Sequence, residues 1–515
     1  MLDKVVSFTK EDFRKYSSSE DFERIVEIDT IPCFLDHIYN NYKELNAICK
    51  DDSSLATFAD LYNDINKVAK ALKEKGIKKG DNVGVLALNS YQFACFSLAA
   101  MAIGAIACLI PAQLDEKVVF GLSKKFELRA LLYQKESEGK TSLLNPNEIV
   151  IIGEDVFNNL KGEIVFDYSI NGKDPACIIM TGGTTGKSKG AVLPHEAIMA
   201  GTINGCYGTK DIFNKSYYAI IPLTHVFGFI RNLMTSLYTG SLIYFNKDKK
   251  MMFQEIQKAK PEVLVIVPAL AELFLNLVKA YGLTMIGGKV KHIICGGASV
   301  PPYLITEYHK LGINFCAGYG LTEFSNMVSG NPEGLKCPES VGMLFPNQEA
   351  KIVDGELWLK GKNMMIGYYK EEEENKNAFC DGWFKTGDLA RFDEENNLYI
   401  IGRIKDIIVL SNGENVSPAY IESKVNELPY IQDSLVTDTV NERGAEVLQV
   451  EVVLRASVIN NMGLEKDKIN EFVTKGVLEV NDKLLDYEKL SKVVIRDKDF
   501  DRTPAMKIIR PKKVF

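Results

Sequence analysis

The sequence predicts an α/β protein with a large multi-layered N-terminal domain, in which mixed β-sheets and helices are joined by a barrel-like section, and a small α+β C-terminal domain. Three observations support this fold class. The chain has 515 residues, which is too long for a single hydrophobic core. Apolar strand-like runs alternate with helical patterns over most of its length, which is typical of α/β layering. This alternation then gives way to short strands with many turns, and finally to a compact mixed pattern.

The alternation comes from short apolar runs that are bounded by turn residues and followed by helical patterns. Such runs indicate strands buried within mixed sheets. They lie at residues 83–88, 149–152, 176–180, 218–221, 241–245, 263–267 and 292–295. A helix is expected to begin near residues 194–196, shortly after a glycine-rich stretch.

One segment has the length of a membrane-spanning helix. Residues 93–110 form an uncharged, largely apolar run of 18 residues. However, the pair Asn89-Ser90 has the character of a helix cap, Gly104 has that of a helix stop, and Pro111 closes the run. We therefore expect a helix over residues 90–103 and a strand over 105–110, and no membrane span.

The last part of the large domain is predicted to be antiparallel or barrel-like. Residues 341–401 contain closely spaced turn signals such as Asp354-Gly355 and Asp381-Gly382. The pattern changes after Arg403 to an α+β unit with a basic tail. The predicted domains are residues 1–403 and 404–515.

Composition excludes several classes of function. The formal net charge of −7 argues against non-specific nucleic-acid binding, which requires a basic field. The ten cysteines are scattered, without metal-ligand spacing, which indicates a reducing compartment and no structural zinc. The N-terminus lacks the apolar core of a signal peptide, so a cytoplasmic location is expected.

The most informative segment is the glycine-rich stretch from Thr181 to Gly190, which follows an apolar strand-like run. Its four glycines let backbone N–H groups approach a polyphosphate, and its hydroxyl and ammonium groups add donors. Two other interpretations stay open from this stretch alone. It can be a flexible linker, or a Walker A loop in which Lys187 and Ser188 bind phosphate, although Thr181 stands where the first Walker A glycine belongs.

Five further motifs accompany this stretch. They are P-L-T-H-V-F-G at residues 222–228, G-Y-G-L-T-E at 318–323, G-W-F-K-T-G-D at 382–388, G-R-I-K-D at 402–406 with L-S-N-G-E-N at 410–415, and D-R-T-P-A-M-K-I-I-R at 501–510. Each polar residue has a plain structural interpretation by itself: Tyr319 can pack a turn, Glu323 can be solvated, Asp388 can cap a turn, and Lys507 can solvate a basic tail. Their joint occurrence in one chain is what points to a common site.

Together and in this order, the motifs resemble those of the adenylate-forming superfamily, which comprises acyl- and aryl-CoA synthetases, luciferases and the adenylation domains of peptide synthetases. The resemblance runs from about residue 46 to the C-terminus, and residues 481–510 are most similar to bacterial long-chain acyl-CoA synthetases. The glycine-rich stretch resembles the signature T-S-G-T-T-G-x-P-K-G, with Gly182 in place of serine and Ser188 in place of proline.

The resemblance implies a nucleotide site. The glycine-rich loop would fold over the β- and γ-phosphates of ATP, Tyr319 would stack on adenine, and Asp388 would bind the ribose hydroxyls with support from Arg403. The predicted ATP- or AMP-binding residues are Thr181, Gly182, Gly183, Thr184, Thr185, Gly186, Lys189, Gly318, Tyr319, Gly320, Thr322, Asp388, Arg403 and Lys507.

The resemblance also implies three catalytic residues. Thr322 would bind the α-phosphate, and Glu323 would hold Mg²⁺, which prefers carboxylate oxygen. Lys507 would lie between the substrate carboxylate and the α-phosphate and neutralise charge as pyrophosphate leaves.

The acid, the thiol and the hinge are assigned in the same way. The acid would be bound by His225, Val226, Phe227, Gly296, Gly297 and Ala298. The thiol arm would pass Ser411, Asn412 and Gly413, and the small domain would rotate about Lys405 between the two half-reactions. Residues 227–232 lack the aspartate with which peptide-synthetase domains bind a substrate ammonium, which favours a fatty or aromatic acid over an amino acid.

The implied function is therefore ATP-dependent conversion of a carboxylic acid to an acyl-adenylate and pyrophosphate, followed by transfer to coenzyme A with release of AMP. The implied cofactors are ATP, Mg²⁺ and coenzyme A. The phosphopantetheine of an acyl carrier protein is an alternative acceptor. A P-loop ATPase that uses Lys187 and Ser188 is a second alternative, and a non-catalytic binding protein of the same fold is a third.

Overall fold

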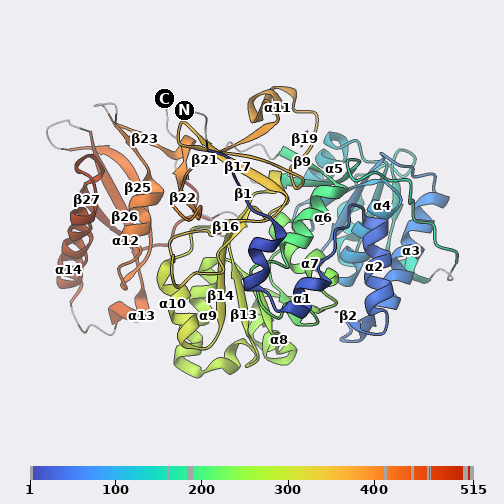
Figure 1. Cartoon of the computed structure of the whole chain (residues 1–515), viewed down its shortest axis with the longest axis horizontal. Helices are drawn as coiled ribbons and strands as arrows, with labels where there is room; N and C mark the ends of the chain where they lie inside the picture. The colour runs from blue at the N-terminus through green and yellow to red at the C-terminus, as the bar shows by residue number, and fades with distance from the viewer. Residues whose placement is uncertain are drawn as a thin grey trace.

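The computed structural model of the protein describes residues 4–158, 162–181, 189–246, 248–410, 414–441, 446–460, 463, 465–502 and 508–510. Over these residues the chain forms a large N-terminal domain with three sheets and a small C-terminal domain around a three-stranded sheet (Figure 1). The buried side chains of the small domain form a cluster of their own, from Ile408 to Leu490. The predicted fold class is thus confirmed.

The first sheet of the large domain has seven strands in the order β19-β9-β8-β5-β4-β6-β7. Its middle strands run parallel and are buried on both faces, which explains their continuous apolar sequences. The strands are β4 (Asn82–Ala87), β5 (Ile106–Pro111), β6 (Ala130–Tyr133), β7 (Val150–Ile152), β8 (Pro175–Thr181), β9 (Lys189–Pro194) and β19 (Gly367–Tyr368).

The second sheet has nine strands in the order β16-β15-β14-β13-β12-β10-β11-β2-β3. Its central strands are again parallel. The strands are β2 (Asn46–Cys49), β3 (Leu55–Thr57), β10 (Ser216–Ala219), β11 (Leu242–Phe245), β12 (Val263–Ile266), β13 (His292–Cys295), β14 (Asn314–Tyr319), β15 (Ser329–Gly330) and β16 (Met343–Leu344). Each predicted strand of these two sheets is present, with ends within about two residues of the prediction.

Helices surround and separate these two sheets, as Figure 1 shows. Those of the large domain are α1 (Ser19–Arg24), α2 (Ile31–Tyr42), α3 (Phe58–Glu74), α4 (Tyr91–Ala102), α5 (Glu116–Lys125), α6 (His195–Asn204), α7 (Thr235–Tyr238), α8 (Met252–Ala259), α9 (Pro268–Tyr281), α10 (Pro302–Lys310) and α11 (Glu372–Ala378). A π-helical segment, η4 (Gly228–Met234), precedes α7.

The 18-residue apolar run forms a buried helix followed by a strand, as predicted. The side chain of Ser90 accepts a hydrogen bond from the backbone N–H of Phe93 at the start of α4. Gly104, with φ of +76°, ends the turn that leads into β5. In the part of the chain that the structure describes, no helix has the length and apolar character needed to cross a membrane.

The predicted antiparallel section forms a third, six-stranded sheet. Five strands follow the order β1-β17-β18-β21-β20, and β22 also pairs with β21. All of these pairs are antiparallel. The strands are β1 (Val6–Ser7), β17 (Gln348–Val353), β18 (Glu356–Gly361), β20 (Phe379–Cys380), β21 (Trp383–Phe392) and β22 (Leu398–Arg403).

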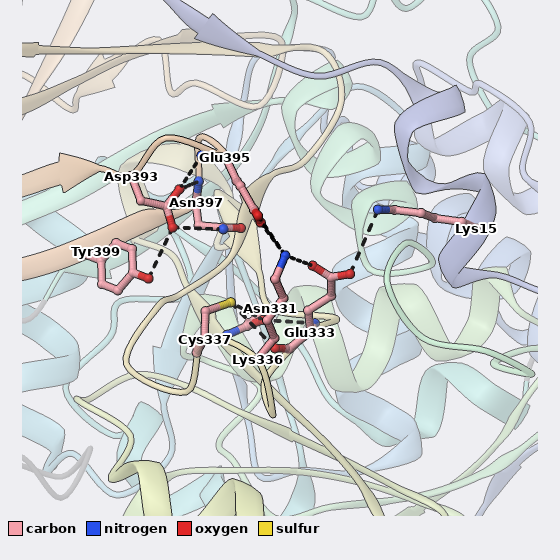
Figure 2. A network of polar contacts seen from close by, with 9 residues as sticks. All are labelled: Lys15, Asn331, Glu333, Lys336, Cys337, Asp393, Glu395, Asn397 and Tyr399. Atoms are coloured by element: carbon pink, nitrogen blue, oxygen red, sulfur yellow. Dashed lines mark hydrogen bonds and ion pairs between the residues drawn. The ribbon is translucent and has the colours of Figure 1, made fainter.

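A network of polar side chains joins this third sheet to the end of the second (Figure 2). Lys336, in the loop after β15, bonds to Glu395 in the β21–β22 turn at 2.6 Å between Nζ and Oε2. Asp393 stabilises the same turn by accepting a hydrogen bond from the side chain of Asn397. The other members are Lys15, Asn331, Glu333, Cys337 and Tyr399. The network includes the turn that joins β21 to β22, the two strands that carry Asp388 and Arg403.

Over its described residues, the small domain contains a three-stranded sheet, a two-stranded ribbon and three α-helices. They are β23 (Ile408–Val409), β24 (Asn415–Val416), α12 (Pro418–Val425), β25 (Ile431–Val440), β26 (Glu446–Leu454), α13 (Ala456–Ile459), α14 (Lys466–Glu479) and β27 (Leu490–Arg496). Arg455 of this domain forms an ion pair with Glu272 of α9, and Lys424 forms one with Glu339 at 2.8 Å. These contacts hold the small domain against the large one in this arrangement. The assignment of the boundary to Arg403 remains a prediction.

Candidate active site

The centre of the candidate site is Asp388, a carboxylate whose residue is only 3% exposed. Its Oδ2 accepts a hydrogen bond from the Tyr319 hydroxyl at 2.5 Å, and its Oδ1 lies 2.7 Å from Nε of Arg403. Burial raises the pKa of the Tyr319 phenol well above its usual value, and the charge of Asp388 raises it further. The phenol therefore keeps its proton and donates to Asp388. Three separate sequence motifs meet at this carboxylate.

The local backbone explains the position of Asp388. Gly387 adopts a left-handed φ of +70°, and its N–H donates to Glu356 Oε1 at 2.8 Å. The N–H of Asp388 donates to the Thr386 hydroxyl at 3.0 Å. These bonds lie where the β18–β21 pairing shifts register, so the strand is bent at the acid. Asp388 and Arg403 are direct cross-strand partners, which brings their side chains together.

The turn after β14 places Tyr319, Thr322 and Glu323. A Cβ atom on Gly320 would lie 1.3 Å from the carbonyl oxygen of Asn326, so this position requires glycine. The close approach folds the chain back into a short 3₁₀ turn, η7 (Thr322–Phe324). The half-buried Tyr319 is thereby held at the end of a parallel strand, where α/β sheets usually bind ligands.

A second cluster forms around Glu323. Its Oε1 accepts a hydrogen bond from the Tyr368 hydroxyl at 2.7 Å. Nζ of Lys189 lies 5.0 Å from the centre of the Tyr368 ring, and Lys189 also forms an ion pair with Glu374 of α11. Lys189 is the first residue of β9 and pairs with Thr181, so the two described residues that flank the centre of the glycine-rich stretch lie side by side. The structure therefore brings the base of that loop next to Glu323.

The metal prediction concerns Glu323 alone. Within the described residues, no group of three or more His, Cys, Asp or Glu side chains could hold a metal ion. A single carboxylate is nevertheless compatible with Mg²⁺, which keeps several waters and is often shared with substrate phosphates. Only one oxygen of Glu323 is bonded to Tyr368, and its donor chemistry fits the ion.

A narrow cavity lies beside Tyr319. Of the predicted nucleotide residues, Gly318, Tyr319 and Gly320 line it; of the predicted acid-binding residues, Phe227, Gly296 and Gly297 do so. His225, Val226 and Ala298 are not among the lining residues. Nδ1 of His225 accepts a hydrogen bond from the N–H of Phe227 at 3.2 Å, which orients the start of η4.

Two functional candidates were missed by sequence reasoning. Arg231 of η4 lines the cavity, and Tyr368 bonds to Glu323. The signal for Arg231 was a lone charge within the apolar stretch 226–234. π-Helical turns occur often at functional sites, which adds weight to this residue. Tyr368 has no comparable signal, because nothing in its neighbourhood indicates a partner 45 residues away.

Several predicted site residues lie outside the described residues. These are Gly182, Gly183, Thr184, Thr185 and Gly186 of the loop, with Lys187 and Ser188, the thiol-acceptor residues Ser411, Asn412 and Gly413, and Lys507. The residues that flank Lys507 are described in part. Arg502 and Ile508 form an antiparallel bridge, and Arg510 bonds to the buried Glu422 of α12 at 2.9 Å between Nη1 and Oε1.

The predicted hinge residue Lys405 lies in a 3₁₀ turn, η8 (Ile404–Asp406), directly after β22. Its neighbour Asp406 approaches Arg510, with 3.8 Å between Oδ2 and Nε. The turn is thus the covalent link between Arg403 at the nucleotide-side cluster and the first strand of the small domain.

Comparisons with known proteins agree with this arrangement. The AMP-binding enzyme family matches residues 35–369, and its C-terminal domain family matches residues 405–514. A probable CoA ligase of Humulus lupulus is 28% identical over 502 residues, which cover 88% of this chain and 87% of that relative.

Solved structures share the fold. An anthranilate CoA ligase in complex with anthranoyl-AMP superimposes with a TM-score of 0.80 at 19% identity, over 93% of this chain and 95% of that one. The o-succinylbenzoate CoA synthetase of Bacillus subtilis, in complex with ATP and a magnesium ion, gives a TM-score of 0.75 at 22% identity, over 93% and 98% of the two chains. Because the family match spans most of the sequence, the chain belongs to the AMP-binding enzyme family, as an AMP-forming enzyme of the acyl-CoA ligase type.

Proposed function

We propose that the protein activates a carboxylic acid with ATP and then transfers the acyl group to coenzyme A. The observation that carries this proposal is the convergence of Tyr319 and Arg403 on the buried carboxylate of Asp388, beside a cavity lined by Gly296 and Phe227. This arrangement offers an aromatic face and a polar anchor for a nucleoside next to space for a second molecule.

In the first half-reaction, a carboxylate oxygen of the acid attacks the α-phosphorus of ATP, and the bond from that phosphorus to the bridging oxygen of pyrophosphate breaks. The protein needs no nucleophile of its own, because the substrate carboxylate is the nucleophile. Its contribution is positioning and charge neutralisation. Tyr319 would hold adenine, and Asp388 would hold the ribose hydroxyls with its remaining acceptor sites.

The phosphate side would be held by Thr322, Glu323, Lys189 and the glycine-rich loop. Glu323 would bind Mg²⁺, which neutralises phosphate charge when bound. Tyr368 would fix the orientation of Glu323 through its hydroxyl. Lys189 is paired with Glu374 in the structure, so binding of a phosphate would replace one anionic partner by another.

In the second half-reaction, the thiol of coenzyme A attacks the acyl carbon and AMP leaves. Relatives named as CoA ligases support coenzyme A as the acceptor. We assign Lys507 to the first half-reaction and Ser411, Asn412 and Gly413 to the second, with a domain rotation at Lys405 between them. The apolar lining from Phe227, Ile294 and Phe345 suits an acid with a fatty or aromatic body. Nothing supports the P-loop ATPase alternative, because the family match includes the glycine-rich loop.

The test is substrate-dependent exchange of labelled pyrophosphate into ATP over a panel of carboxylic acids. Exchange with at least one acid, and release of AMP when coenzyme A is added, is the expected result. Lys507→Ala should lower exchange by about 100-fold or more, while thioester formation from supplied acyl-adenylate changes little. Production of ADP and phosphate, or no exchange with any acid, would refute the proposal.

A further inference from the structure

Arg231 is a buried cation, and within the described structure two of its three guanidinium nitrogens have no hydrogen-bond partner. Its residue is 2% exposed, and its Nε and Nη1 atoms are buried without a hydrogen-bond partner. A guanidinium stays protonated in proteins and carries five N–H donors. In the part of the chain that the structure describes, neither of these two nitrogens is hydrogen-bonded to a carboxylate. Buried charges are normally paired, because removing them from water is costly.

Four titratable side chains lie close enough to Arg231 for its charge to influence their pKa values, and all four are uncharged at neutral pH. Burial raises the pKa of the Cys206 thiol to about 12, and it also raises the pKa of the Cys316 thiol. Burial also raises the pKa of Tyr217 to about 12 and lowers that of His292 to about 4. At neutral pH these groups are thiols, a phenol and an uncharged imidazole. None of them supplies the anion that Arg231 lacks.

A second unsatisfied donor lines the same cavity. Tyr207 lies just after the end of α6 and is only 3% exposed. It lines the cavity, and its hydroxyl has no hydrogen-bond partner in the described structure. Burial raises the pKa of this phenol, so the hydroxyl keeps its proton. A guanidinium and a hydroxyl that both line one cavity are the donors that bind an oxyanion such as a carboxylate.

The cavity connects these donors with the nucleotide-side residues. Tyr319, Gly296 and Gly297 line it together with Arg231 and Tyr207. An acid whose reacting carboxyl lies near Tyr319 can therefore extend toward Arg231. A plain alkyl or aryl group there would leave the guanidinium buried and unpaired.

We propose that the acid activated by this protein carries a second anionic group, in the first instance a second carboxylate, that is bound by Arg231 and Tyr207. This inference rests on the proposed acid-activating function and narrows its substrate class. It makes Arg231 the residue that determines specificity at this site.

The experiment measures kcat/KM for pyrophosphate exchange with the full chain, MgATP and matched pairs of acids. Each pair is an alkyl or aryl dicarboxylic acid and its monomethyl ester, which have nearly the same shape but differ by one charge. At least one diacid should exceed its ester by about 100-fold, since a polar site strongly rejects an analogue that leaves its donors unpaired.

Three variants assign the preference to this site. Arg231→Met keeps a long side chain without charge and should bring the diacid-to-ester ratio to about 1. Arg231→Lys keeps the charge but loses the two-pronged donor geometry, and should retain a ratio of about 10. Tyr207→Phe removes one hydroxyl and should lower the ratio by about 10-fold. If Arg231→Met does not fold, the other two variants decide.

The outcomes separate the inference from the function on which it rests. Exchange with monocarboxylic acids, with no diacid better than its ester, would overturn the inference and leave the proposed function standing. A diacid preference that survives in all folded variants would also overturn it. Absence of exchange with every acid, esters included, would refute the proposed function and the inference together.

Discussion

Asp388 and Arg231 are both buried ionisable residues, but within the described structure they differ in how completely their polar atoms are hydrogen-bonded. Asp388 is 3% exposed and is bonded to Tyr319 and Arg403, whereas Arg231 is 2% exposed and has two nitrogen atoms without hydrogen-bond partners among the described residues. Asp388 lies where we propose that the ribose of ATP binds, and every ATP molecule carries this group. Arg231 lies where we propose that the carboxylic acid substrate binds.

This difference indicates that the two parts of the site are completed in different ways. The nucleotide side is preorganised, because its carboxylate is held by bonds within the protein before ATP binds. The acid side is left incomplete, so that a substrate with the right charge completes it. Specificity of this kind depends on the penalty for leaving a buried polar group unpaired.

The largest expected effect comes from removing the charge at the preorganised side. Asp388→Asn should lower kcat/KM for pyrophosphate exchange by about 1000-fold, equivalent to about 4 kcal/mol, because the ribose loses its acceptor and Arg403 loses its partner. The measurement is initial-rate exchange at several ATP concentrations.

Asp393→Asn is the matched control. Asp393 is another carboxylate of the same two-strand unit, but it only stabilises the β21–β22 turn (Figure 2). Its activity should stay within about twofold of the unaltered protein. Comparable losses in both variants would mean that Asp388 acts through the fold and not through the nucleotide.

Neutral substitutions of the two buried residues should change the stability of the protein in opposite directions. Arg231→Met should raise the free energy of unfolding of the ligand-free protein by about 1–3 kcal/mol, because it removes an unpaired buried charge. Asp388→Asn should lower it by about 1–3 kcal/mol, because it leaves Tyr319 and Arg403 imperfectly paired. Calorimetric Tm values measure both effects. A lower Tm for Arg231→Met would show that the guanidinium has a stabilising partner in solution.

A smaller effect is expected at Tyr368, which would position the metal-binding carboxylate without touching substrate. Tyr368→Phe should raise the Mg²⁺ concentration for half-maximal exchange by about fivefold, or about 1 kcal/mol, since one hydrogen bond to Glu323 is lost. Tyr369→Phe is the control, because its hydroxyl bonds to Asn82 and Glu127 instead. If Tyr368→Phe leaves the Mg²⁺ titration unchanged, the hydrogen bond from Tyr368 does not position Glu323 for metal binding.

Much of the fold follows from local sequence. Ser90 and Gly104 bracket α4, so the helix and the following strand could be predicted from caps and turn residues alone. The juxtaposition of Asp388 and Arg403 was also expected, but only through the resemblance, because no periodicity of the sequence pairs residues of β21 with those of β22.

The remaining features depend on tertiary packing. The Tyr368 hydroxyl reaches Glu323 because β19 pairs with β9 at the edge of the seven-stranded sheet, and that pairing is not visible in the sequence. Arg231 was visible as a lone charge, but a lone arginine in an apolar run usually finds a carboxylate from another element. Only the packed structure shows that its Nε and Nη1 atoms lack such a partner among the described residues.

The smallest effect on stability is expected in the solvent-exposed polar network between the second and third sheets. Lys336 has a side chain that is 59% exposed, and its partner Glu395 is 58% exposed, although they lie 2.6 Å apart (Figure 2). Water and salt screen such pairs, and ordering two long side chains costs entropy. Lys336→Met should therefore change Tm by less than about 1 °C, and less still in 1 M salt. If the Tm of Lys336→Met fell as far as that of Asp388→Asn, this network would couple the second and third sheets cooperatively. In that case, the exposure of an ion pair would not by itself distinguish the weak ion pairs of this protein from the strong ones.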